Sequence, residues 1–184
     1  MSRPLRADAQ RNRARVLEVA AETFAAEGLS VPVHEIARRA GVGTGTVSRH
    51  FPTKESLFQA ILLDRMEQLV RQAAELSEHE GEEEAFFAFF ATMVEEGAAN
   101  RGLVDALAGA GFDFEAVAAD GKYDVMGAWR GLLERAQRAG AVRADADMAD
   151  VKALLTGCVD RERGAADPVA RARMLAIVRV GLRA

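Results

Sequence analysis

Apolar residues recur along most of this chain at the three- and four-residue intervals of amphipathic helices, and no useful length alternates as a β-strand does. The first expected helix covers about residues 8–27, and one stripe of it holds Val16, Leu17, Ala20, Ala21 and Phe24. Gly28 suits the position just beyond its end, where the chain turns through a left-handed conformation. The pattern therefore predicts an all-α protein of about nine helices.

Two short helices are expected next. The first starts at Pro32, which a first helical turn tolerates, and Gly41 ends it. The second covers about residues 44–50 and stops before Pro52, because proline disfavours a helical residue in front of it. A tight turn with glycine at the bend, between two short helices, is typical of a helix-turn-helix. The second short helix would then be the recognition helix, with Val47 and Phe51 on its buried side.

The remaining pattern predicts longer helices. Thr53 is expected to cap the first of these, and the acidic stretch 78–84 is expected to interrupt the pattern. The next helix carries four phenylalanines in five positions, and a glycine-rich region poorly suited to rigid helix follows from 102 to 121. A helix ended by Gly140 comes next. Asp147 and the pair Asp167-Pro168 are expected to begin the last two helices.

Composition and charge narrow the class of protein. The 184 residues are 49% hydrophobic and 28% charged, as in soluble globular proteins, and neither a membrane span nor a signal peptide is visible, so we expect a cytoplasmic protein. The single Cys158 excludes an internal disulfide. Although the net charge is −4, residues 1–60 carry nine Lys and Arg against six Asp and Glu. A basic N-terminal segment on an acidic body is expected where one end meets phosphates.

One long motif resembles a known family. Residues 33–57 read VHEIARRAGVGTGTVSRHFPTKESL, and the preceding helix ends in FAAEGL at residues 24–29. Both closely resemble the DNA-binding region of the TetR (tetracycline repressor) family, over about residues 8–62. The later patterns WRGLL at 129–133 and AGAVRAD at 139–145 are similar to those of many members. The resemblance implies a helix-turn-helix domain at residues 1–55 and a helical effector-binding and dimerisation domain at 56–184.

The resemblance implies a double-stranded DNA operator as partner and roles for individual residues. Gly45 would allow close approach to the groove, Thr46 and Lys54 would hold phosphates, and Arg49 and His50 would reach bases or phosphates. Ser48 stands where the family usually has tyrosine, and its hydroxyl has a shorter reach. The residues expected to contact DNA are Thr44, Gly45, Thr46, Ser48, Arg49, His50 and Lys54.

For the C-terminal part, the resemblance implies a cavity for an apolar or amphipathic small molecule. Four phenylalanines within residues 86–90 cover more than one helical face, so most are core and some can line a cavity. The expected pocket residues are Phe86, Phe90, Met93, Phe112, Tyr123, Met126 and Trp129, with Phe114, Thr92, Asn100 and Thr156 as further candidates. The apolar faces of the last two helices either are buried internally or, as the resemblance implies, pair with a twin subunit. The expected interface residues are Val151, Leu154, Leu155, Leu175, Val178 and Leu182.

These observations favour a ligand-responsive repressor that binds a palindromic operator as a homodimer. An architectural DNA-binding protein without an effector is one alternative. A small helical enzyme is another, although no activated nucleophile, paired carboxylates or metal motif supports it. No cofactor is expected. No metal site is expected either, because His79 has no second His or Cys at ligand spacing.

Overall fold

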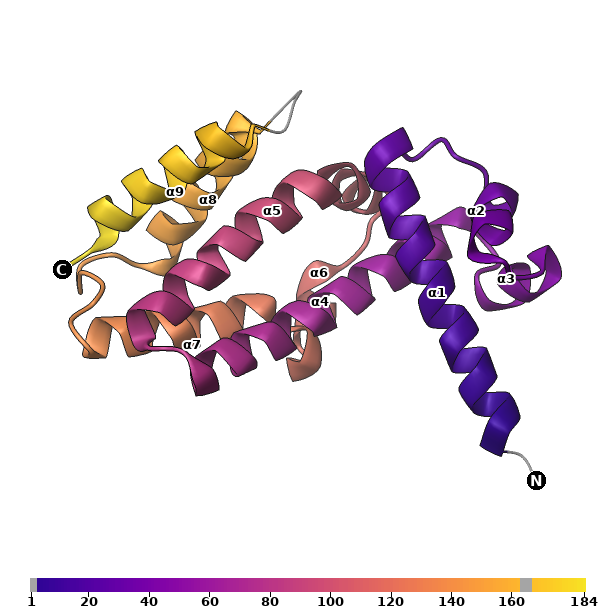
Figure 1. The fold of residues 1–184 in the computed structure, drawn as a ribbon, viewed down its shortest axis with the longest axis horizontal. Helices are drawn as coiled ribbons and strands as arrows, with labels where there is room; N and C mark the ends of the chain where they lie inside the picture. Colours follow the sequence, from indigo (N-terminus) through magenta and orange to yellow (C-terminus); the bar gives the residue numbers. More distant parts are fainter. Residues whose placement is uncertain (1–2, 163–166) are drawn as a thin grey trace. The chain divides into compact units, whose positions relative to one another are not determined.

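The computed structural model describes residues 3–162 and 167–184, with side chains from Asp8 onward except that of Ala9. In this part of the chain it is all-α, with nine α-helices, which confirms the predicted fold class. The helices are α1 (Arg3–Glu27), α2 (Val33–Ala40), α3 (Thr44–His50), α4 (Lys54–His79), α5 (Glu82–Gly109), α6 (Phe114–Ala118), α7 (Val125–Arg138), α8 (Met148–Arg161) and α9 (Pro168–Leu182) (Figure 1). A short 3-10 helix, η1 (Gly121–Tyr123), precedes α7.

The chain forms two compact units. The N-terminal unit holds the residues up to Arg65 together with Gly102–Asp113, and the C-terminal unit holds Met66–Arg101 and Phe114–Ala184. Helices α4 and α5 therefore each contribute to both units. The first turns of α4, up to Arg65, pack with the N-terminal unit. The predicted boundary between two domains after residue 55 stays a prediction.

The ends of the N-terminal helices follow the predicted signals. Gly28 and Gly41 adopt φ angles of 82° and 66°, the left-handed region that glycine enters without a steric penalty. Helix α3 has the predicted bounds, whereas Pro32 is the N-cap of α2 rather than part of its first turn. The Ser56 backbone N–H donates to Thr53 Oγ1 at 3.0 Å, which is the predicted cap of α4.

The core of the N-terminal unit fixes α3 against the other helices. The Phe24 and Phe58 rings meet edge to face, with centroids 5.1 Å apart. The other large buried side chains of this core come from all four helices and the turn after α3: Val16, Leu17, Ile36, Val47, Phe51, Leu57 and Ile61. Because Val47 and Phe51 are anchored in this core, the opposite side of α3 is held outward in a fixed direction.

The core of the C-terminal unit is built around Trp129 on α7. Its indole meets the rings of Phe89 and Phe90 edge to face, at centroid distances of 5.9 and 5.6 Å. Phe86 and Phe87 are buried as well, so all four phenylalanines of α5 belong to one thick core. Buried residues of α4, α8 and α9 complete the cluster, and α8 and α9 lie side by side (Figure 1).

The prediction for the glycine-rich region was wrong in part. Helix α5 continues through Gly102 to Gly109, and only the segment beyond it breaks into α6 and η1. Leu103 and Leu107, four residues apart, are both buried on one face of this last part of α5. Burial of these two leucines offsets the low helix propensity of the glycines. The pattern of residues alone does not show that this burial occurs.

Aspartates begin the last two helices, as predicted. Asp147 Oδ1 accepts hydrogen bonds from the backbone N–H groups of Ala149 and Asp150, at 2.8 and 3.0 Å. Asp167 Oδ1 accepts from those of Val169 and Ala170, at 3.1 and 3.0 Å. These caps satisfy donors that have no partner within the helix, and they fix where each helix starts.

Candidate nucleic-acid interface and effector site

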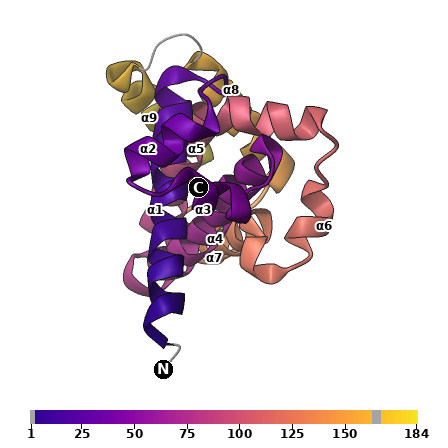
Figure 2. The ribbon, with the colours of Figure 1, turned by 90° about the vertical axis from the view of Figure 1, so that its right-hand side faces the viewer.

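Helix α3 presents a polar surface on the side away from its core. Thr44, Gly45, Ser48, Arg49 and His50 are exposed and Thr46 is half-buried, whereas Val47 and Phe51 are buried as predicted. Figure 2 views this N-terminal unit with α1, α2 and α3 in front. A Cβ atom added at Gly45 would meet nothing closer than Arg49 Nη2, at 3.8 Å. The packing of this chain therefore does not require glycine at position 45.

The aromatic rings that surround Lys54 could not be predicted from the sequence pattern. Lys54 is half-buried at the start of α4, and its Nζ atom lies 5.7 Å from the Phe24 ring centroid and 5.9 Å from that of Phe58. A cation over aromatic faces is held in place by the ring quadrupoles. The aromatic pair that joins α1 to α4 thus also positions the ammonium group at the first turn of α4.

Two polar residues of α1 lie beside the recognition helix, and sequence analysis did not single them out. Asn12 and Arg13 line a small surface depression together with Thr46 and His50 of α3. The Arg13 guanidinium carbon lies 5.8 Å from the Phe51 ring centroid. Arg13 stands four residues before Leu17, so it extends the buried stripe of α1 toward the N-terminus, and this spacing is the signal that could have identified it.

The arginines of α2 are tied to carboxylates instead. Glu35 accepts from Arg38 Nε at 2.8 Å and from Arg39 Nε at 2.7 Å, and Arg39 also pairs with Glu27. These two guanidinium groups lower the pKa of Glu35 to about 2. Glu35 therefore favours the folded state above its ordinary pKa, and this contribution is lost as the pH falls toward 2. In contrast, Arg13 and Arg49 have no carboxylate partner among the described residues.

The structure gathers most of the predicted pocket residues. Phe86, Phe90 and Trp129 are buried in the C-terminal core, and Met93 and Met126 are partly buried against it. Tyr123 is half-buried in η1, where Lys122 Nζ lies 4.6 Å from its ring centroid. Phe112 belongs to the N-terminal unit, and Phe114, in the C-terminal unit, is half-buried at the start of α6.

The polar candidates differ in their surroundings. Thr92 Oγ1 accepts a part-buried hydrogen bond from Gln72 Nε2 at 3.0 Å, which links α5 to α4. Asn100 Nδ2 donates to Glu96 Oε2 at 2.8 Å on its own helix. Thr156 is exposed and donates to the Lys152 carbonyl at 2.9 Å. Thr92 is therefore the polar candidate that joins two helices of the C-terminal unit.

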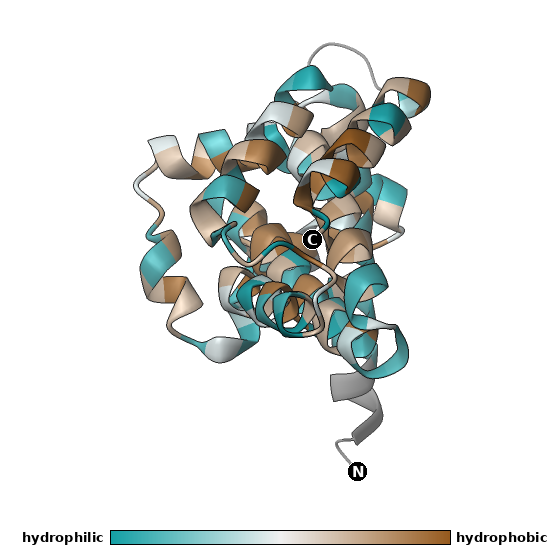
Figure 3. Ribbon diagram, turned by 90° about the vertical axis from the view of Figure 1, so that its left-hand side faces the viewer, coloured by the Kyte–Doolittle hydropathy of each residue, from teal (hydrophilic) through white to brown (hydrophobic). Residues whose placement is uncertain are grey.

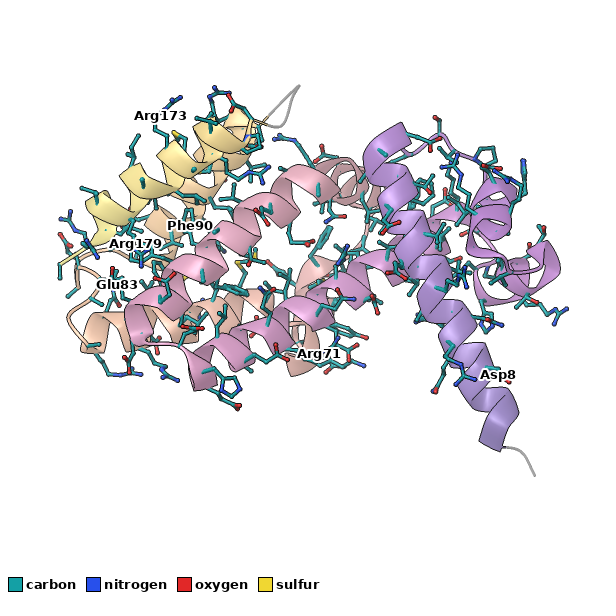
Figure 4. All side chains as sticks on the ribbon, in the orientation of Figure 1. Asp8, Arg71, Glu83, Phe90, Arg173 and Arg179 are labelled. Carbon is teal, nitrogen blue, oxygen red and sulfur yellow. The ribbon has the colours of Figure 1, made fainter. Side chains whose placement is uncertain are left out.

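A surface groove runs between α5 and α9 of the C-terminal unit. Its volume is about 340 Å³, and Phe87, Phe90, Ala91, Ala172, Leu175 and Arg179 are among the residues that line it. Arg179 Nε lies 3.3 Å from Glu83 Oε1, and the guanidinium carbon lies 4.9 Å from the Phe87 ring centroid. Figure 4 labels Glu83, Phe90 and Arg179 in this region. The groove thus has an apolar wall and an ion pair beside it.

The structure places most of the predicted interface residues in or against the hydrophobic core of the C-terminal unit. Val151, Val178 and Leu182 are buried in the core of their own subunit, and Leu155 and Leu175 pack against that core, so only Leu154 is exposed. Instead, α9 exposes Val169, Ile177 and Val180, with 73%, 59% and 75% of their surfaces accessible. Figure 3 shows hydropathy along the helices of this unit, with apolar residues in brown. Both the inward and the outward face of α9 are apolar. The interface residues predicted from the sequence lie mainly on the inward face.

Within the described residues, no three His, Cys, Asp or Glu side chains gather as they would around a metal ion. None of the helices that the structure describes has both the length and the apolar character needed to cross a membrane.

This arrangement defines a helix-turn-helix DNA-binding protein with a helical C-terminal unit. Residues 16–61 match the family model for bacterial regulatory proteins of the tetR family, and residues 82–184 match that of the C-terminal domain of SbtR-like transcriptional regulators. The chain belongs to the TetR family. It is therefore a DNA-binding transcriptional regulator and not an enzyme.

Similar proteins agree with this assignment. A TetR regulator from Mycobacterium vanbaalenii is 51% identical, with a TM-score of 0.79 over 98% of this chain and 100% of that chain. The regulator SCO0520 from Streptomyces coelicolor is 32% identical, with a TM-score of 0.72 over 93% and 98%. A structure described as the molecular basis for control of antibiotic production by bacterial hormones is 25% identical, with a TM-score of 0.69 over 95% and 98%. SrpR from Pseudomonas putida is 40% identical over 70 residues, which cover 38% of this chain and 33% of SrpR.

Proposed function

We propose that this protein is a repressor that binds a palindromic operator as a homodimer and releases it when a small molecule binds the C-terminal unit. The observation that carries the proposal is the exposed side of α3, where Arg49 has no carboxylate partner among the residues that the structure describes, while the neighbouring arginines of α2 are neutralised. An unpaired guanidinium on a recognition helix is free to pair with guanine or phosphate.

Individual contacts follow from the exposed groups of the N-terminal unit. Arg49 and His50 would reach base edges, and Gly45, which packing does not require, would let the backbone approach the groove. Phosphates would be held by hydroxyl groups, by one side-chain amide and by cations whose positions are already fixed by aromatic rings. The residues proposed for this role are Thr44, Thr46, Ser48, Lys54, Asn12 and Arg13. Because Ser48 is shorter than tyrosine, the phosphate contacts of α1 and α4 would bear more of the anchoring.

The homodimer would form through the outer face of α8 and α9. Val169, Ile177 and Val180 give α9 a set of strongly exposed apolar side chains, and Leu154 adds one from α8. Exposed apolar residues that gather on one face mark an interaction surface. A two-fold axis at this face matches the two-fold symmetry of a palindrome, in which each recognition helix reads one half-site.

The effector would bind at the aromatic and methionine residues of the C-terminal unit, on α5 and α7. Phe90, Met93, Met126 and Trp129 supply the apolar lining that ligand pockets need, and Thr92 supplies a polar group. The hormone-linked relative supports a small-molecule signal of this kind. A ligand releases DNA only through different affinities for the two conformations of the dimer, so binding must change the preferred spacing of the recognition helices.

We expect a metabolite library screened by thermal shift to yield stabilisers, some of which displace operator DNA in an anisotropy assay. Phe90→Ala should weaken the response to these compounds by about tenfold or more while changing effector-free operator affinity by less than about threefold. Val104→Ala, which shortens an exposed apolar side chain outside the C-terminal unit, is the control and should leave both properties unchanged. If no compound releases the operator, the architectural alternative replaces the repressor proposal.

A further inference from the structure

Trp129 carries a buried hydrogen-bond donor that has no partner among the described residues. The side chain is fully buried, at 0% exposure, and its indole Nε1 has no hydrogen-bond partner within the described part of the chain. A buried tryptophan N–H usually finds an acceptor, and leaving it unpaired costs the full desolvation of the group. This position is therefore unfavourable unless another molecule supplies the acceptor.

The groups around the indole explain why the protein does not supply one. Phe89 and Phe90 present their rings to the indole edge to face at 5.9 and 5.6 Å, and all three side chains belong to the hydrophobic cluster of the C-terminal unit. Phenyl rings and aliphatic side chains carry no oxygen or nitrogen acceptor.

The edge of this cluster is adaptable. Met126 lies three residues before Trp129 on α7, and Met93 lies three residues after Phe90 on α5, so each methionine shares a helical face with one of these aromatic residues. Both methionines are only partly buried. Because methionine is unbranched and flexible, these side chains can move aside without disturbing the backbone. Phe90 lines the α5–α9 groove and its ring also meets the indole, so this one residue contacts both.

We propose that the effector is a largely apolar, uncharged molecule with one exposed oxygen acceptor, such as a ketone or ether, and that Trp129 Nε1 donates to this oxygen. This inference rests on the proposed function, because it assigns a chemical class to the effector of the C-terminal unit. An ionic group at the same place would be buried without a counter-charge, which the apolar surroundings disfavour. Trp129 thereby selects ligands by the presence of an acceptor, while the phenylalanines and methionines select by shape.

The test uses the fact that the chain has a single tryptophan. In the full-length protein with ¹⁵N-labelled tryptophan, one indole N–H resonance reports on Trp129 alone. The probes are matched pairs of a ketone and its hydrocarbon, indan-1-one with indane and benzophenone with diphenylmethane. We expect at least one ketone to move the resonance downfield in a saturable way and to bind about tenfold more tightly than its hydrocarbon, as one buried hydrogen bond implies.

Trp129→Phe should abolish the preference for the ketone and leave the affinity for the hydrocarbon within about threefold, whereas Val104→Ala, outside the C-terminal unit, should preserve the preference. If Trp129→Phe fails to fold, the resonance of the unaltered protein still decides. The proposal is overturned if no pair shows a preference, or if the N–H is bonded to a buried water that the ketones do not displace. Operator-releasing compounds that leave the indole resonance unmoved would overturn this inference alone, whereas the absence of any releasing compound would overturn the proposed function.

Discussion

Replacing both Ile177 and Val180 with aspartate is expected to split the dimer and to lower operator affinity by about a thousandfold or more, to the level of non-specific binding. Both side chains are among the most exposed apolar groups of α9, so the change leaves the core of the subunit intact. In a dimer interface, however, four carboxylates would be buried without partners, which is strongly unfavourable. Analytical ultracentrifugation and operator titration at fixed salt measure the two effects.

Val104→Asp is the matched control for this prediction. Val104 is also an exposed apolar residue, with 37% of its surface accessible, but it lies in the N-terminal unit and outside the proposed interface. This variant should remain dimeric. A double variant on α9 that is still dimeric, or an unaltered protein that is monomeric at micromolar concentration, would contradict the proposed interface. Replacing Val178 with a charged residue would not test the interface, because Val178 is buried in the core of its own subunit and the change would disturb that core.

Arg49→Ala is expected to weaken binding to the operator by roughly 1–3 kcal/mol and to relax the sequence preference at one position of each half-site. The reason is that Arg49 is exposed on α3, has no carboxylate partner in the described part of the chain, and can pair with a base edge in two hydrogen bonds. Fluorescence anisotropy with the operator and with single-base variants of it measures both effects. Unchanged affinity and unchanged preference would remove Arg49 from the base-reading residues.

Two arginines of α1 provide the comparison for Arg49. Arg13→Ala should weaken binding to all sequences about equally and lower the slope of affinity against salt by about one unit, because a phosphate contact carries no sequence information. Arg15→Ala removes another exposed charge, on a different face of α1, and should change neither quantity. Equal effects from both variants would show that the position of Arg13 over Phe51 has no specific role.

Local signals predicted the start and end of helices accurately. Gly41 ends α2, and Asp147 and Asp167 begin α8 and α9, because each acts on backbone groups within a few residues of itself. The polar side of α3 could also be predicted, since Val47 and Phe51 leave only one direction for the remaining side chains. Signals of this kind depend on short-range geometry that the sequence displays directly.

Features that depend on packing between distant residues could not be predicted in the same way. The helical state of Gly102–Gly109 depends on the burial of Leu103 and Leu107, and the site of Lys54 depends on Phe24 and Phe58. Helix α9 is apolar on two faces, so periodicity could not tell the inward Val178 from the outward Ile177. Contacts between elements override local preference in each case.

Selection of bound sequences from a random DNA library tests the central claim most directly. A homodimer that reads DNA with two copies of α3 should enrich an inverted repeat, whose half-sites are centred about 34–36 Å apart along the duplex. The Ile177 and Val180 double variant should lose this enrichment under the same conditions. An unenriched library, or a single unrepeated site bound by the unaltered protein, would contradict the account.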